Sequence, residues 1–444
     1  MTAPASNHKN GGNTMRTMLA GCLAAALTTV AAQAQPAFDW KKYDGQTITF
    51  LSSNHPWPNA VLPHIEEFKK LTGINVRVDT YNEVQMRTRL TTMLQTKSTD
   101  VDIFMTLAAR GGQIYKKAGW YRDLGLLAAD KAQTAPDYDF ADFGESLLQR
   151  KNFGGTTIGI PLNIEGPVLY YRRDVLAECK VEPPKSLDAL VAAAAKLKAC
   201  KPDMVPFASR GLLPALPYTF VPFYFNMGGT FDRLPQRQAY CSPTGERAIQ
   251  MYSDLLGKYG PPGVSNYTFY QVTEIMGQGR AAMSYEASNE FGKVMAFPSR
   301  PADTDLTLLP MGSVQKPLVI NWSIAISAFS TKPGPAWYFI QWATSKAMDE
   351  RLAFDGIAPP RKSVFEGEKF RQWVSELPVR QHWVDTLREM GENGMPGSAP
   401  PQIARSPEAG EAVGSYVTKV MQGQMSARDA GCELDDKLIS LIAP

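Results

Sequence analysis

The chain has 444 residues, with 46 Lys and Arg against 43 Asp and Glu, so its formal net charge is +3. Hydrophobic residues make up 44% and charged residues 20%, which is enough apolar material for full cores and excludes disorder as the main state. This small charge excess also argues against a dedicated nucleic-acid binder, which is usually strongly basic. The length predicts two or three domains.

The apolar segment at residues 18–34 has the features of a secretory signal peptide. Arg16 precedes it, and the segment Ala32-Gln33-Ala34 ends it like a cleavage site. The run is also short for a membrane span, which needs about 20 apolar residues. We therefore expect residues 1–34 to be removed on export. A lipoprotein-like sequence ends at Cys22, but most of the apolar run follows it, so lipidation there is the less favoured alternative.

Four cysteines remain after this removal, an even number that suggests disulfide bonds in an exported chain. Three pairings are possible, and four buried free thiols are the alternative. We favour Cys179–Cys200 with Cys241–Cys432, in which the first bond closes a loop of about 20 residues. The chain has no CxxC pair, so nothing supports a zinc-ribbon or thioredoxin-type site.

The mature chain begins with alternating strand and helix patterns. Strands are predicted at residues 48–51, 74–78 and 102–105, with apolar residues at helical spacing between them. Gly73, just before the second strand, is typical of a helix C-cap. This β-α-β-α-β order predicts a mostly parallel sheet covered by helices, which is an α/β fold.

The same alternation continues to the C-terminus. Further strands are predicted at residues 158–161, 168–171, 281–285, 306–309 and 322–326. Ser186 and Ser426 stand where each would cap a helix, and Pro335 where it would open an aromatic-rich one. No internal repeat or long low-complexity tract interrupts the pattern.

Motifs of the common enzyme classes are absent from the sequence. No HExxH, GxSxG or P-loop pattern occurs. Residues 277–282 match a GxGxxA dinucleotide pattern, but they precede a predicted strand, whereas a dinucleotide motif follows one. We therefore expect no catalytic residue, no metal and no cofactor. What remains is a recognition-type composition, with Trp and Tyr beside Gly, Asn, Pro and acids in predicted loops, as a carbohydrate pocket needs.

Five segments, in order along the mature chain, carry a recognisable pattern: residues 67–76, 170–176, 184–188, 279–283 and 322–340. Together they resemble the extracellular solute-binding proteins of bacterial ATP-binding-cassette importers. Within that group they resemble the sugar-binding family that includes the maltose-binding protein. The resemblance implies a periplasmic protein that is not an enzyme and that delivers its ligand to permease subunits at the inner membrane.

The resemblance also implies a type II periplasmic binding protein fold, in which two α/β lobes enclose a ligand cleft. Lobe 1 is expected at 35–155 with 310–356, and lobe 2 at 156–309 with 357–444. All four cysteines then fall in lobe 2, in agreement with the favoured pairing. Closure of the lobes would bury the ligand and signal the permease. We expect a monomer with no nucleic-acid partner.

Ligand-binding residues are implied by the family's motifs and by the loops that follow predicted strands. Arg110 stands in a stretch that resembles a sugar-contacting motif of maltose-binding proteins, although the acid before it is replaced by Ala109. Trp322 matches a tryptophan that stacks on the ligand in the family, with Asn321 in place of a glycine. The full candidate set is Asn54, His55, Trp57, Arg110, Glu165, Arg210, Tyr218, Tyr285, Glu286, Asn321 and Trp322.

The candidate set contains two arginines and two acids, which suits a neutral polyhydroxy ligand. A phosphate or uronate binder should show a cationic excess, and a polyamine binder several acids. We expect a monosaccharide, a sugar alcohol or a short oligosaccharide. The alternatives are a non-sugar solute, such as a polyamine or a phosphorylated polyol, and a secreted carbohydrate-active hydrolase with two carboxylates across the bound sugar.

Overall fold

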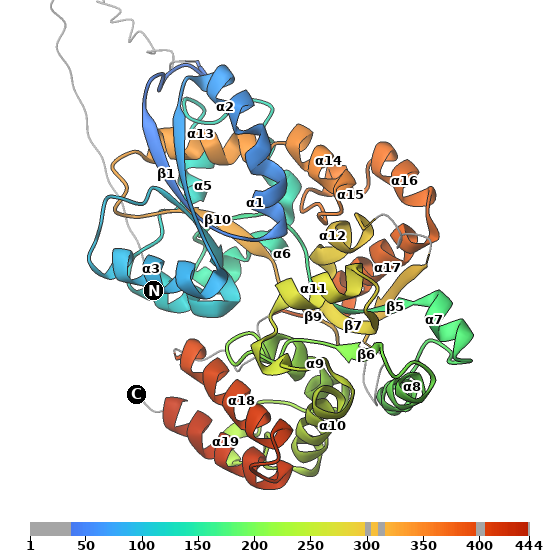
Figure 1. Ribbon diagram of the computed structural model, residues 1–444. Helices are drawn as coiled ribbons and strands as arrows, with labels where there is room; N and C mark the ends of the chain where they lie inside the picture. The colour runs from blue at the N-terminus through green and yellow to red at the C-terminus, as the bar shows by residue number, and fades with distance from the viewer. Residues whose placement is uncertain (1–36, 298–302, 310–315, 397–404, 443–444) are drawn as a thin grey trace, which may run out of the picture. The chain divides into compact units, whose positions relative to one another are not determined.

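The structure, a computed structural model, describes residues 37–442 except 298–302, 310–315 and 397–404. The predicted signal peptide and Cys22 lie outside the described residues. Ala37–Pro444 forms a single compact unit. Within the described ranges it contains two main sheets, each covered by helices, and one short pair of strands (Figure 1).

The first sheet has the strand order β2-β1-β3-β10-β4. Strands β1, β2 and β3 run parallel, and β10 pairs antiparallel with β3 and with β4. The parallel order predicted for the start of the chain is therefore confirmed. The strand bounds are β1 Thr47–Ser53, β2 Asn75–Tyr81, β3 Ile103–Leu107, β4 Ile160–Pro161 and β10 Trp322–Ile326.

Gly73 ends the helix before β2, as predicted. Its φ of +75° is left-handed, which favours glycine, and a Cβ there would lie 1.8 Å from a carboxylate oxygen of Asp44, so a larger residue would displace that side chain. The helices of this part are α1 Pro56–Val61, α2 Ile65–Thr72, α3 Glu83–Gln95, α4 Gln113–Lys117, α5 Leu124–Ala129, α6 Gly144–Leu148, α13 Pro333–Ala343 and α14 Lys346–Phe354.

The core of the first sheet depends on the aromatic-rich helix α13. Trp337 and Phe339 are fully buried, and the rings of Phe339 and Phe50 of β1 lie 5.6 Å apart. The helix begins at Pro333, earlier than the predicted Pro335. Prolines at both positions suit a first turn, where the missing N–H groups need no helical partner.

The second sheet has the order β6-β7-β5-β8, with β6 and β7 parallel and β5 antiparallel to both of its neighbours. Its strands are β5 Pro167–Arg172, β6 Val205–Ala208, β7 Ala281–Ala287 and β8 Thr304–Leu308. Separate buried clusters lie on its two faces, so helices cover both. A third sheet pairs β9 Leu318–Val319 with β11 Met395–Pro396.

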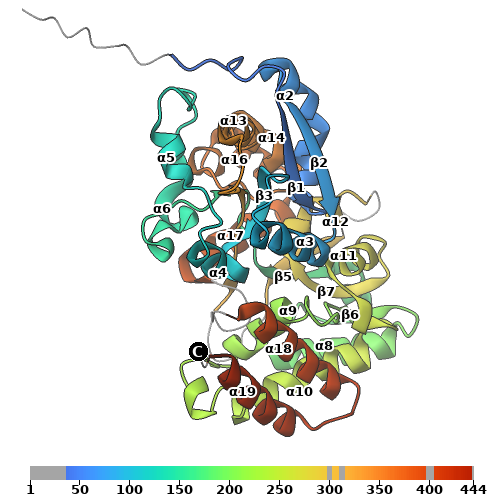
Figure 2. The same cartoon turned by 90° about the vertical axis from the view of Figure 1, so that its left-hand side faces the viewer.

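Helices cover both faces of the second sheet. Among them, α10, α18 and α19 lie side by side in both views (Figures 1 and 2). As predicted, Ser186 caps α8 through the Ala189 N–H and Ser426 accepts from the Asp429 N–H before α19. The helices are α7 Arg173–Glu178, α8 Leu187–Cys200, α9 Pro217–Asn226, α10 Pro243–Tyr259, α11 Phe269–Gly277, α12 Phe291–Met295, α15 Lys362–Phe365, α16 Glu368–Ser375, α17 Pro378–Asn393, α18 Ser406–Met421 and α19 Ala427–Ile442.

The structure contains the predicted disulfides, Cys179–Cys200 and Cys241–Cys432. The first joins the ends of α7 and α8 across 21 residues, and the second joins the start of α10 to α19 across 191. Beside the second bond, the buried Asp435 carboxylate accepts three backbone N–H groups of residues 239–241. The last helix is thus fixed to the second sheet's helices twice, by a covalent bond and by a carboxylate.

The two disulfides should contribute unequally to stability. Cys241–Cys432 closes the longer loop. In the chain-entropy model it therefore contributes about 2 kcal/mol more to the free energy of unfolding than Cys179–Cys200 does. Urea unfolding of the two Cys→Ser double variants measures this difference. Equal losses of stability in the two variants would contradict it.

Candidate functional site

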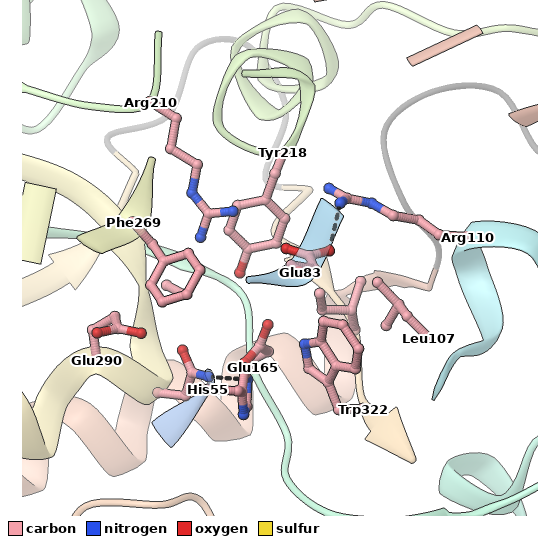
Figure 3. Close-up of a pocket in the computed structure, with 13 residues that line it drawn as sticks. His55, Glu83, Leu107, Arg110, Glu165, Arg210, Tyr218, Phe269, Glu290 and Trp322 are labelled. Carbon is pink, nitrogen blue, oxygen red and sulfur yellow. Dashed lines mark hydrogen bonds and ion pairs between the residues drawn. The ribbon is translucent and has the colours of Figure 1, made fainter. Parts of the chain in front are cut away.

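A cavity with an enclosed space of about 20 Å³ is lined by residues from both main sheets. Four of its residues follow, or end, parallel strands at their carboxyl ends: His55 after β1, Leu107 in β3, Arg210 after β6 and Ala287 in β7. Ligands of α/β proteins bind at such edges. The full lining is His55, Glu83, Leu107, Arg110, Glu165, Arg210, Tyr218, Phe269, Ala287, Asn289, Glu290, Ile320 and Trp322 (Figure 3).

The floor of the pocket is formed by two chain segments that pass between the sheets. Glu165, just before β5, and Ile320, just before β10, exchange both backbone hydrogen bonds, at 2.9 and 2.8 Å. Next to them, Trp322 starts β10 directly opposite Leu107, the last residue of β3. The pairing of strands therefore brings Glu165, Ile320 and Trp322 to one place.

Arg210 and Glu286 form a buried ion pair on the wall from the second sheet. Nε of Arg210 donates to Glu286 Oε1 and Oε2 at 2.9 and 3.0 Å, and its Nη2 also contacts the carboxylate. Burial lowers the pKa of Arg210, but the Glu286 carboxylate outweighs it and holds that pKa above its ordinary value. The guanidinium also stacks 4.2 Å from the centre of the Tyr218 ring. Glu286 thereby fixes an arginine that faces the cavity.

Arg110 and Glu83 form a second charged group on the wall from the first sheet. Nη1 of Arg110 donates to Glu83 Oε1 at 3.0 Å, and Arg87 donates to the same oxygen at 2.7 Å. Burial raises the pKa of Glu83, but the surrounding arginines outweigh it and lower that pKa to about 2. Burial, opposed by Glu83, lowers the pKa of Arg110 to about 10. Both groups are therefore charged at neutral pH.

His55 links the two walls through Asn289. The Nδ1 atom of His55 accepts from the Trp57 N–H at 3.3 Å. Nε2 lies 2.8 Å from the Asn289 amide and 3.5 Å from Glu165 Oε2. The other polar atom of the Asn289 amide is buried and has no hydrogen-bond partner in the described part of the chain.

Aromatic rings complete the pocket, with Phe269 and Trp322 on opposite sides of it (Figure 3). The Tyr218 hydroxyl is buried and, like the free end of Asn289, has no hydrogen-bond partner among the described residues. Burial raises the pKa of Tyr218 well above its ordinary value, so the phenol keeps its proton. The site thus presents ring faces and unused neutral hydrogen-bonding groups to the same space.

The structure brings together six of the predicted ligand-binding residues: His55, Arg110, Glu165, Arg210, Tyr218 and Trp322. The other five do not line this cavity. Asn54 is exposed, and its carbonyl accepts from the Tyr270 hydroxyl. Trp57 and Tyr285 are buried in the cores of the two sheets. Glu286 stands behind Arg210, and Asn321 lines a neighbouring hollow, where its Oδ1 accepts from Gln149 at 2.6 Å.

Seven lining residues were not in the predicted set: Glu83, Leu107, Phe269, Ala287, Asn289, Glu290 and Ile320. Three of them could have been found from the strand pattern. Glu83 follows β2, and Asn289 and Glu290 follow β7, so all three stand beyond the carboxyl ends of strands. Phe269 opens a helix and carries no such signal.

Among the residues described, no three His, Cys, Asp or Glu side chains come together in a way that could hold a metal ion. In the same ranges, no helix has both the length and the apolar character needed to span a membrane.

Glu286→Gln should be strongly destabilising, because it leaves the buried Arg210 charge unpaired. Breaking a buried pair costs about 3–5 kcal/mol, so urea unfolding should show a loss of this size. The control is Glu408→Gln, which breaks the exposed pair of Glu408 with Arg405 and should change stability by less than about 1 kcal/mol. Similar losses in both variants would contradict the role given to Glu286.

Known proteins that are similar to the chain include two curated relatives. One is an erythritol/L-threitol-binding protein of Mycolicibacterium smegmatis, 28% identical over 76% of this chain and 75% of its own length. The other is a mannitol-binding protein of Pseudomonas aeruginosa, 25% identical over 94% of this chain and 96% of its own length.

A solved structure with the same fold is the maltose-bound protein of T. maritima, with a TM-score of 0.77 and 21% identity, covering 89% of this chain and 99% of that one. The fold is therefore the expected two-lobe, type II periplasmic binding protein fold, with the ligand cleft between its lobes. The family model described as bacterial extracellular solute-binding protein matches residues 53–350, which is more than half of the chain. The chain belongs to the bacterial extracellular solute-binding protein family.

Proposed function

We propose that this protein is the substrate-binding subunit of an ABC importer and that it binds a small neutral sugar alcohol or monosaccharide in the cavity described above. The observation that carries the proposal is the pair of unused polar groups, the Tyr218 hydroxyl and one end of the Asn289 amide, beside aromatic rings. A buried polar group without a partner costs about 1–3 kcal/mol, which ligand hydroxyls would offset. Ring faces pack on the C–H groups of the same ligand.

The charges around the cavity support a neutral ligand. Arg210 is neutralised by Glu286, and Arg110 shares the Glu83 carboxylate with Arg87. Both arginines that line the cavity therefore already contact a carboxylate, which disfavours a phosphorylated polyol. The same pairs position N–H groups and carboxylate oxygens that can bond to hydroxyls.

Size and relatives support a small ligand. The enclosed space of about 20 Å³ is small, so a ligand as large as an oligosaccharide would not fit in it. The curated relatives are named for binding erythritol, L-threitol and mannitol, which are linear polyols. Both arguments favour a sugar alcohol or a monosaccharide over an oligosaccharide.

The proposal assigns ligand contact to the six predicted residues that line the cavity. Glu286 would act by holding Arg210, while Asn54, Trp57, Tyr285 and Asn321 would support the loops and strands around the site. The lobes are proposed at 35–155 with 310–356 and at 156–309 with 357–444. β4, which ends at Pro161, pairs with β10 and so belongs to the first sheet. We therefore propose that the first crossing between the lobes follows Pro161 and not residue 155.

Family membership supports an extracellular or periplasmic location and an ABC transport context. We propose export by a signal peptide, function as a monomer, and docking of the ligand-bound form on permease subunits at the inner membrane.

A cationic solute such as a polyamine is the second candidate. It is favoured by Glu165, which among the described residues contacts no Lys or Arg and lies 3.5 Å from the His55 ring, and by the further carboxyl group of Glu290. A panel of erythritol, L-threitol, D-mannitol, maltose, putrescine and a polyol phosphate separates the candidates by thermal shift of residues 35–444. A ligand that binds only the folded state raises its stability by RT ln(1 + [L]/Kd).

Tyr218→Phe should weaken binding of the polyol about tenfold, because it removes one hydrogen bond to the ligand. The measurement is titration calorimetry with the polyol selected by the panel. Tyr240→Phe is the matched control, since its hydroxyl is likewise buried without a partner in the described chain but lies outside the cavity. Equal affinity in wild type and Tyr218→Phe would contradict the assignment of this hydroxyl, and a shift with putrescine alone would contradict the polyol.

A further inference from the structure

Glu290 is a buried carboxyl group that lines the cavity without a cationic partner. It ends the short turn Ser288–Glu290 that follows β7, and it is 2% exposed. Its Oε2 atom accepts from Thr273 Oγ1 of α11 at 3.0 Å. Within the described ranges, no Lys, Arg or His forms an ion pair with it. Figure 3 shows Glu290 on the side of the pocket opposite Arg110.

The buried groups around Glu290 do not supply a free positive charge. Glu286, the nearest acid in the chain, already takes up the charge of Arg210. Across the pocket stand His55 and Glu165, which are in contact with each other. The titratable groups that act on Glu290 from the packed elements are Glu286 of β7, Arg210 after β6, Tyr170 of β5, Tyr270 of α11 and Lys293 of α12.

A carboxylate in such a place is expensive to ionise. Arg210 is already paired with Glu286, so ionising Glu290 as well would leave an uncompensated charge in a desolvated wall. Burial, and then the charge of Glu286, raise the pKa of Glu290 to about 8. The Thr273 hydrogen bond acts in the opposite direction, but burial and the charge count outweigh it, so this group keeps its proton at neutral pH.

We propose that Glu290 is a specificity-determining residue that binds the ligand as a neutral carboxylic acid, donating a hydrogen bond from Oε1 to a ligand oxygen. Oε2 is already an acceptor for Thr273, which leaves Oε1 to carry the proton. A polyol hydroxyl can accept this bond, whereas an ammonium group cannot. The inference rests on the proposed function and adds to it a donor that selects hydroxyl over amine.

The proposal couples ligand binding to the protonation of Glu290, and it predicts opposite effects for a polyol and for an amine. Above pH 8 the free site has lost the Glu290 proton, so a polyol must take one up in order to bind. An amine would do the opposite, because it favours the carboxylate and releases the proton at pH 7. With a pKa near 8, polyol binding at pH 8.5 should take up about 0.8 proton, and Kd should rise about tenfold from pH 7 to pH 9.

Titration calorimetry with erythritol and with D-mannitol, each in two buffers of different ionisation enthalpy, measures this uptake on the full mature chain. In Glu290→Gln the amide reproduces the neutral acid, with an oxygen for Thr273 and an N–H donor for the ligand. It should bind at pH 7 within about threefold of wild type, with no uptake and no rise of Kd to pH 9. Glu246→Gln, which removes an exposed carboxyl group of α10, is the control and should retain the wild-type uptake.

Each outcome bears on a different claim. If neither polyol binds the wild type at pH 7, the proposed function fails, and this inference fails with it. If the polyol binds with the same affinity at pH 7 and pH 9 and takes up no proton, the inference fails alone. Proton uptake that persists in Glu290→Gln would assign the proton to another group and would also overturn it.

Discussion

Two backbone hydrogen bonds between Glu165 and Ile320 hold the site together. Each residue belongs to a segment that leads into a different sheet, Glu165 into β5 and Ile320 into β10. A third segment joins them, because the carbonyl of Ala358 accepts from the Ile164 N–H. Most other lining residues are held by one sheet or the other, and His55 and Asn289 form a further side-chain contact between the walls. Any motion that opens the pocket must either pivot about these bonds or break them.

Charges are placed so that the walls are polar without attracting ions. Both arginines that line the cavity are bound to carboxylates from their own sheet, Arg210 to Glu286 and Arg110 to Glu83. Such pairs contribute little net stability when buried, but they fix the direction of each donor. Because each of these contacts lies within one wall, a change in the separation of the walls does not break it. A ligand therefore meets oriented donors and acceptors at little electrostatic cost.

Local sequence signals predicted the elements well and the site only in part. The cap at Ser186, the left-handed Gly73 and strand β10 depend on neighbours a few residues away, and all were predicted. Trp57 shows what local sequence cannot predict. A tryptophan at this loop position could line a pocket or join the core, and in the structure it packs in the core of the first sheet. Asn289 and Glu290 show the converse. Their role depends on His55 and Thr273, which are distant in the chain, so only their position after a strand indicated them.

The unused polar groups of the cavity are ordered before any ligand arrives. The Tyr218 ring is held between the core of the first sheet and the stacked guanidinium of Arg210, which Glu286 fixes in turn. Asn289 is held through its bond to His55, whose ring is fixed by the Trp57 N–H. Because these side chains are already held in place, a ligand that bonds to them costs little conformational entropy. A larger part of the free energy of each hydrogen bond therefore contributes to affinity. The buried pairs that contribute little to stability thus serve recognition by keeping the neutral groups in place.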